Sequence, residues 1–182
     1  ASATPSPQVT PHTEIPTTTP DIKEEQTSVT PSSGTKGDLK WKYKFKNSGY
    51  DLQVIDNTAF FQADDSIYAL DTETAVLKWE NNLAKSMLDV LEATIQDGVM
   101  CIGSSDNVYA LDAETGVKKW QYVNKLADGQ GVYDRPVLFG GAVYIGCGDG
   151  NLYAFDAPTG EQKWKYKTGA PIYSSPAIAG EI

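Results

Sequence analysis

Side chains that commonly carry out catalysis are scarce in this chain of 182 residues. Its only histidine, His12, lies in an N-terminal stretch rich in Thr and Pro, so the rest of the chain lacks imidazole acid–base chemistry, histidine-based triads and histidine zinc ligands. The two cysteines, Cys101 and Cys147, are 46 residues apart. We interpret them as small buried residues on separate strands, with a disulfide between them as the alternative. We therefore predict no catalytic residue.

Aspartates recur at positions that the sequence predicts to be hairpin tips. They are Asp64, Asp65, Asp106 and Asp149. A calcium site would need several oxygen ligands that converge at about 2.3 to 2.6 Å from the ion. Aspartate is also a preferred turn residue, because its carboxylate bonds to the backbone of its own turn. We interpret these four residues as turn residues and predict no metal site, with ion binding as the alternative.

One eleven-residue phrase, Ala-x-Asp-x-x-Thr-(Gly/Ala)-x-x-x-Trp, occurs three times. Its aspartates, Asp71, Asp112 and Asp156, are separated by 41 and 44 residues. A period of about 40 to 45 residues is typical of one four-stranded propeller blade. The repeat therefore predicts an all-β propeller of antiparallel blades. The candidate structural site consists of the recurring residues Ala69, Asp71, Thr74, Trp79, Ala110, Asp112, Thr115, Gly116, Trp120, Ala154, Asp156, Thr159, Gly160 and Trp164.

Turn-forming residues divide each repeat into four short β runs. In the third repeat these runs are 136–139, 142–146, 151–155 and 162–166. The first hairpin turns of the other repeats, Asp56-Asn57 and Asp97-Gly98, can adopt the positive φ of a tight hairpin. About three and a half blades are expected, which is a partial ring. The expected elements are an outer strand at 40–46, blades at about 51–82, 88–123 and 133–168, and the start of a further blade at 172–182.

Each residue of the phrase has an expected mechanical role at the turn between the third and fourth strands. The Asp carboxylate and the Thr hydroxyl can accept hydrogen bonds from the turn backbone. Gly116 and Gly160 can adopt a left-handed conformation. Alanine is small where blades approach closely, and the Trp ring can fill the gap to the next blade while its indole N–H bonds to a carbonyl. Ala75 replaces the glycine in the first repeat, so that turn should be strained or differently shaped.

Residues 1–36 differ in composition from the repeats, which occupy residues 37–182. They contain 5 Ser, 9 Thr and 6 Pro, and almost no large apolar residues. Such a stretch buries too little surface to offset its ordering entropy, so we predict a disordered, semi-extended spacer. Stalks of this composition commonly hold a domain away from a cell surface, which favours an extracytoplasmic protein tethered by the spacer. A plain linker between domains is the alternative.

The charge of the chain argues against a nucleic-acid partner. The net charge is −9, and residues 37–182 contain 20 acids and 13 bases. This surface repels a phosphate backbone. Residues 40–46 and 163–167 alternate lysines with aromatic residues, a pattern that can form a stacking platform for single strands. We instead expect outermost strands with a buried ring face and lysines that discourage edge pairing. No run of about 18 apolar residues is present, so no membrane span is predicted.

The repeated phrase resembles the tryptophan-docking motif of the quinoprotein, or PQQ-like, β-propeller family over residues 37–182. In that family the motif connects blades and does not bind the quinone. The resemblance implies either a PQQ-dependent alcohol or sugar dehydrogenase or a non-enzymatic scaffold, such as the periplasmic propeller subunit of the outer-membrane β-barrel assembly machinery or a receptor-kinase sensor domain. The dehydrogenases have adjacent cysteines, a catalytic Asp and calcium-binding Glu and Asn residues. Cys101 and Cys147 are not adjacent, so this chain departs from that pattern.

We therefore expect a non-enzymatic, extracytoplasmic domain that binds a protein partner and carries no cofactor. The alternatives are a fragment of a PQQ-dependent dehydrogenase, with PQQ and calcium, and a ligand-sensing ectodomain. Residues 40–46 match a fourth strand without its first three, and 174–178 match a first strand without successors. These phases suggest a longer protein that continues beyond the C-terminal end. They also suggest self-association through open blade faces, since an exposed apolar face is unusual in a monomer.

Overall fold

The computed structural model describes residues 42, 49–63, 66–82, 93–104, 107–123 and 135–179, with the backbone alone described at 49–52 and 104. The described ranges contain twelve strands and no helix. The strands are β1 (Gly49–Ile55), β2 (Thr58–Ala63), β3 (Ser66–Asp71), β4 (Leu77–Asn81), β5 (Thr94–Gln96), β6 (Val99–Ser104), β7 (Asn107–Asp112), β8 (Lys118–Val123), β9 (Val137–Phe139), β10 (Ala142–Gly146), β11 (Asn151–Asp156) and β12 (Gln162–Lys167).

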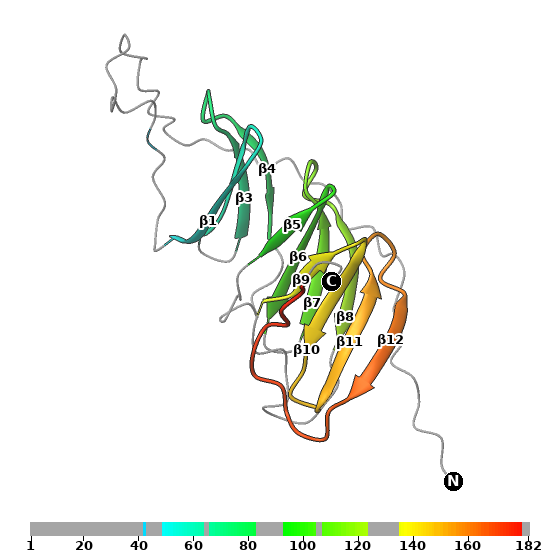
Figure 1. Cartoon of the computed structure of the whole chain (residues 1–182). Helices are drawn as coiled ribbons and strands as arrows, with labels where there is room; N and C mark the ends of the chain where they lie inside the picture. The colour runs from blue at the N-terminus through cyan, green and yellow to red at the C-terminus, as the bar shows by residue number, and fades with distance from the viewer. Residues whose placement is uncertain are drawn as a thin grey trace. The chain divides into compact units, whose positions relative to one another are not determined.

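The strands form three four-stranded sheets, each in sequence order (Figure 1). We call β1–β4 the first blade, β5–β8 the second and β9–β12 the third. Every pair of neighbouring strands is antiparallel, as expected for strands joined by tight hairpins. The first blade belongs to one compact unit, and the second and third blades belong to another. The predicted outer strand at 40–46 lies outside the described residues, except for Lys42, which is exposed and not in a strand.

The first two strands of each blade are joined by a two-residue hairpin. Gln96 pairs with Val99 across Asp97-Gly98, and Phe139 pairs with Ala142 across Gly140-Gly141. All four turn residues have positive φ, between 50° and 73°. This matches the twist that two-residue hairpins require. In the first blade the turn residue Asp56 has φ 51°.

The repeated Ala and Trp are opposite each other on neighbouring strands in every blade. Ala69 pairs with Trp79, Ala110 with Trp120 and Ala154 with Trp164. The register shifts directly after each alanine, so the same irregularity occurs three times. The three alanines are completely buried. A methyl group opposite the indole leaves room for the ring, which explains why the two residue types recur together.

The turn of the first blade has the same shape as the other two, although it contains Ala75. The amide of Ala75 donates to the carbonyl of Asp71 at 2.9 Å, and those of Gly116 and Gly160 donate to Asp112 and Asp156 at 2.8 Å. Ala75 has φ 57°, beside 71° and 75° at the two glycines. Of the two outcomes expected for this turn, a strained turn or a different shape, strain is the one observed. The alanine is held in a left-handed conformation that is unfavourable for a residue with a Cβ.

The main core lies between the facing sheets of the second and third blades. One continuous cluster of buried side chains includes Val108, Trp120 and Tyr122 from the second blade and Ile145 and Phe155 from the third. The inner strands also meet, since the Thr94 hydroxyl donates to the Pro136 carbonyl at 2.6 Å. In the first blade a smaller cluster contains Phe61, Ala63 and Leu70. The blade interface is thus a hydrophobic core between two sheets.

The segment after β12 is bonded to the third blade but forms no strand within 168–179. Its Thr168 amide donates to the Gly150 carbonyl at 2.9 Å, and its Ile172 amide donates to the Cys147 carbonyl at 3.1 Å. The expected first strand at 174–178 is therefore absent from the described segment. A strand is stabilised by a neighbouring strand, and the described residues provide no further strand for this segment to join.

The conformation of Ala75 yields a test by substitution. Ala75→Gly removes the cost of holding a Cβ at positive φ, so it should raise the free energy of unfolding by up to about 1 kcal/mol. The reverse change in the second blade, Gly116→Ala, should lower it by about 1 to 2 kcal/mol. Urea unfolding of the two variants measures both effects. A loss of stability in Ala75→Gly would contradict this account of the turn.

Candidate functional site

The carboxylate of the repeated phrase is the centre of its own turn. Oδ1 of Asp71 accepts the Thr74 amide and the Thr74 hydroxyl, both at 2.9 Å, and the Glu73 amide at 3.0 Å. The Thr74 hydroxyl oxygen in turn accepts the Val76 amide at 3.3 Å. The second and third turns repeat the amide and hydroxyl bonds of the threonine at Asp112 and Asp156. These carboxylates therefore already serve as hydrogen-bond acceptors within their turns.

Each of these aspartates also faces a lysine on the fourth strand. Lys119 lies 3.0 Å from Asp112, Lys163 lies 3.1 Å from Asp156, and Lys78 lies 3.9 Å from Asp71. The hydrogen bonds of Thr74 lower the pKa of the Asp71 carboxyl. The Thr159 hydroxyl and Lys163 lower the pKa of Asp156. At Asp112 burial acts to raise the pKa, but the bonds from Lys119 and Thr115 outweigh it, so this pKa is also lowered.

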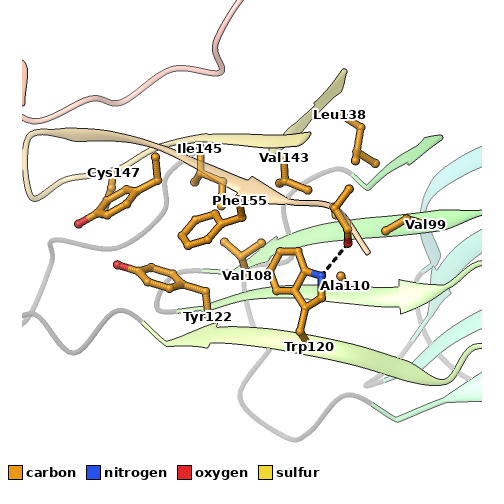
Figure 2. Close-up of a cluster of buried hydrophobic side chains, with 13 residues drawn as sticks. Val99, Val108, Ala110, Trp120, Tyr122, Leu138, Val143, Ile145, Cys147 and Phe155 are labelled. Carbon is orange, nitrogen blue, oxygen red and sulfur yellow. Dashed lines mark hydrogen bonds between the residues drawn. The ribbon is translucent and has the colours of Figure 1, made fainter. Parts of the chain in front are cut away.

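Trp120 joins the second blade to the third. Its side chain is 3% exposed, and its indole N–H donates to the Ala157 carbonyl at 2.7 Å (Figure 2). The ring lies against Gly160, where a Cβ would come within 2.6 Å of Trp120 Cγ. Only glycine fits this close approach without a shift of the ring. Ala157 follows Asp156 in the third copy of the repeated phrase. The tryptophan of the second copy therefore binds to the turn of the third.

The second aromatic residue of β8, Tyr122, packs on the same face as Trp120 (Figure 2). Its ring centroid lies 4.9 Å from that of Phe155 and 5.5 Å from that of Tyr153, both on β11. The Tyr153 hydroxyl donates to the carboxylate of Asp149. Burial and this carboxylate raise the pKa of Tyr153, so its hydroxyl stays protonated and remains a donor. Tilted aromatic rings thus pack across the interface, and the part-buried hydrogen bond between Tyr153 and Asp149 lies beside them.

The sequence analysis did not identify this polar contact. Asp149 also accepts the Asn151 amide at 2.9 Å, so it acts as a turn residue and as the acceptor of Tyr153. The available signal was the tyrosine at the third position of the blade's third strand, which recurs as Tyr68 and Tyr109. The other predicted tip residues, Asp64, Asp65 and Asp106, lie outside the described residues. Within the described ranges, no three His, Cys, Asp or Glu residues cluster as metal ligands would.

Both cysteines are reduced and buried in the main core. Cys101 lies on β6 of the second blade, and Cys147 directly follows β10 of the third. Burial raises the pKa of both thiols, that of Cys147 to about 11. A thiol with a raised pKa is a poor nucleophile near neutral pH, so the chemistry of both residues here is that of small core side chains.

The last tryptophan of the repeat does not have the environment of the others. Trp79 is 8% exposed and lies 5.9 Å from Phe60 between ring centroids, whereas Trp164 is 43% exposed and Tyr166 is 65% exposed. The expectation of a buried ring face on the strand at 163–167 is therefore wrong. Within the part of the chain that the structure describes, Tyr144 of the same sheet is the aromatic neighbour of Trp164. The second blade, which belongs to the same unit as the third, does not cover these rings.

Three repeated four-stranded blades with these turns define the chain as a β-propeller of the PQQ-like type, present as a partial ring. A family model described as outer membrane protein assembly factor BamB matches residues 22–131 and 104–182. The chain belongs to this family. No curated protein sequence matches it. No helix in the described residues is long and apolar enough to span a membrane.

Solved structures of both enzymes and other proteins are similar to the chain. BamB from Moraxella catarrhalis is 26% identical with a TM-score of 0.57, over 74% of this chain and 41% of that one. Quinohemoprotein alcohol dehydrogenase from Comamonas testosteroni is 27% identical with a TM-score of 0.52, over 64% and 20%. The computationally designed Ika4 protein is 17% identical with a TM-score of 0.60, over 77% and 86%. The chain thus spans less than half of the two natural proteins.

The environments of the tryptophans predict unequal contributions to stability. Trp120→Ala should lower the free energy of unfolding by about 3 to 5 kcal/mol, because it empties the blade interface and leaves the Ala157 carbonyl without its donor. The matched change Trp164→Ala removes a partly exposed ring and should cost about 1 kcal/mol or less. Denaturant unfolding compares the two. Equal losses would show that the interface is not the source of stability.

The aspartate turns predict a loss of stability in acid. Their folded pKa values are lowered, so their contribution is complete above the unfolded value of about 3.9 and is lost as pH falls through the folded values. The melting temperature should therefore decrease when the pH is lowered below about 4. In the double variant Asp112→Asn with Asp156→Asn this fall should be smaller. The control variant, Glu114→Gln with Glu161→Gln, removes two charges from exposed positions beside the same turns. If the acid-induced decrease in melting temperature is reduced equally in this control, the aspartates are not its source.

Proposed function

We propose that this chain is part of a non-enzymatic scaffold domain that binds other proteins. The proposal rests on one observation, which is that the repeated polar residues make their hydrogen bonds within their own turns. The carboxylates of Asp71, Asp112 and Asp156 accept bonds within their own turns and face lysines on the next strand. Their geometry thus supports the assembly of blades. The family description, an assembly factor for outer membrane proteins, supports a role in binding proteins.

The proposal places the domain outside the cytoplasm. Two features support it: the Ser-, Thr- and Pro-rich composition of residues 1–36, which suits a tether, and the name of the family, which refers to the outer membrane. The acidic charge of the repeats is consistent with protein partners and unfavourable for nucleic acid.

A fragment of a PQQ-dependent dehydrogenase is the second candidate. It is favoured by the similarity to the quinohemoprotein alcohol dehydrogenase from Comamonas testosteroni, which is 27% identical over 64% of the chain. The cysteines argue against it, because Cys101 and Cys147 are single buried core residues rather than an adjacent pair. The receptor ectodomain remains a hypothesis from the sequence alone.

Addition of the cofactor separates the scaffold from the enzyme. The purified chain is incubated with PQQ and calcium, desalted and examined by absorbance, with the Comamonas enzyme treated in the same way as a positive control. A scaffold should retain no quinone absorbance. Retention of one PQQ per chain, or any alcohol-dependent dye reduction after reconstitution, would overturn the proposal.

A further inference from the structure

The aromatic rings of the main core form a continuous path between the second and third blades. Phe155 is fully buried, and its ring centroid lies 6.0 Å from that of Trp120 and 5.8 Å from that of Tyr153. The ring of Tyr122 lies close to two of these rings, 4.9 Å from Phe155 and 5.5 Å from Tyr153 (Figure 2). All four side chains are buried in the same cluster. Trp120 and Tyr153 are therefore connected through packed rings.

The two ends of this path differ in the groups that accept their polar hydrogens. The Trp120 indole N–H donates to the Ala157 carbonyl at 2.7 Å. A peptide carbonyl is a far weaker base than a carboxylate, so an oxidised indole cannot release its proton to it. The Tyr153 hydroxyl donates to the carboxylate of Asp149, which can take up a proton.

This difference sets the direction in which an electron moves. An electron lost from Trp120 leaves a positive charge on an indole in the apolar core, and an uncompensated charge is unfavourable there. An electron lost from Tyr153 is accompanied by transfer of the phenol proton to Asp149, so the ring remains neutral. Oxidation of the core is thus more favourable at Tyr153 than at Trp120.

We propose that Tyr153 and Asp149 form a one-electron redox site, to which oxidation of Trp120 moves. Trp120 first loses one electron to a one-electron oxidant, such as dioxygen acting on the light-excited indole, and dioxygen becomes superoxide. Trp120 then regains an electron from Tyr153 through the Phe155 ring, while the phenol proton passes to Asp149. The products are an intact indole, a neutral tyrosyl radical and a neutral carboxylic acid. This inference goes beyond the proposed scaffold function and does not depend on it.

Cys147 is the competing end point. Its thiol is buried, and it bonds to the same carboxylate of Asp149. A thiol is also readily oxidised by one electron. The tyrosine is favoured because its ring belongs to the aromatic path that begins at Trp120.

The test uses the full chain with Trp41→Phe, Trp79→Phe and Trp164→Phe, in which Trp120 is the only tryptophan. A flash of light that tryptophan alone absorbs ionises Trp120 in air-saturated buffer. Transient absorption then follows the tryptophan radical and the tyrosyl radical. The tyrosyl radical should appear as the tryptophan radical decays, and more slowly in D2O than in H2O, because a proton moves with the electron. Slow exchange of the Trp120 indole proton verifies that the interface is intact in each variant.

Four substitutions in this chain locate the site. Tyr153→Phe should abolish the tyrosyl signal. The matched control Tyr122→Phe removes a hydroxyl from the neighbouring ring and should retain at least half of the signal. Asp149→Asn should slow the conversion at least about tenfold, because an amide does not take up the proton. Cys147→Ala should leave the rate unchanged.

The results that would overturn the inference are equally specific. The starting chain forms no tyrosyl radical, or forms it at the same rate in H2O and D2O. The radical survives Tyr153→Phe at full yield, or its rate is unaffected by Asp149→Asn. A tyrosyl radical that forms only after Cys147→Ala would identify the thiol as the end point instead.

Discussion

The close packing of Trp120 against Gly160 is the contact on which the described interface depends. It fixes the distance between the second and third blades, since the ring has room only where residue 160 lacks a Cβ. It also satisfies a buried indole donor with the Ala157 carbonyl. An unsatisfied donor in such a core would cost about 1 to 3 kcal/mol, so the hydrogen bond and the shape of the glycine turn must occur together.

Several local features hold that carbonyl in place. The Ala157 amide donates to the Gly141 carbonyl at 3.0 Å, which ties the turn to the first hairpin of the same blade. Asp156 closes the other side of the turn through Thr159. The second blade has the same arrangement, in which the Ala113 amide donates to Gly98. The repeated polar residues thus shape the surface that receives a tryptophan, and this explains why they recur at fixed spacing.

The period, the strand order and the roles of Asp and Thr follow from local chemistry, so a single sequence predicts them. Other features depend on neighbours that a single sequence does not place. Trp120 and Trp164 belong to copies of the same phrase, yet Trp120 is buried and Trp164 is 43% exposed, because the third blade packs against Trp120. Residues 174–178 match a first strand in phase, yet they form no strand in the described segment. Ala75 adopts the conformation of glycine because the surrounding turn bonds impose it.

Exchange of the indole N–H protons with solvent, measured by NMR on the intact chain in deuterated water, tests the central contact most directly. The Trp120 proton is donated to a carbonyl inside the core, so it should exchange only when the blades separate. The Trp164 proton belongs to a partly exposed ring and should exchange at least a hundredfold faster. Comparable, fast exchange of both protons would contradict the account, because it would mean that Trp120 does not hold the two blades together.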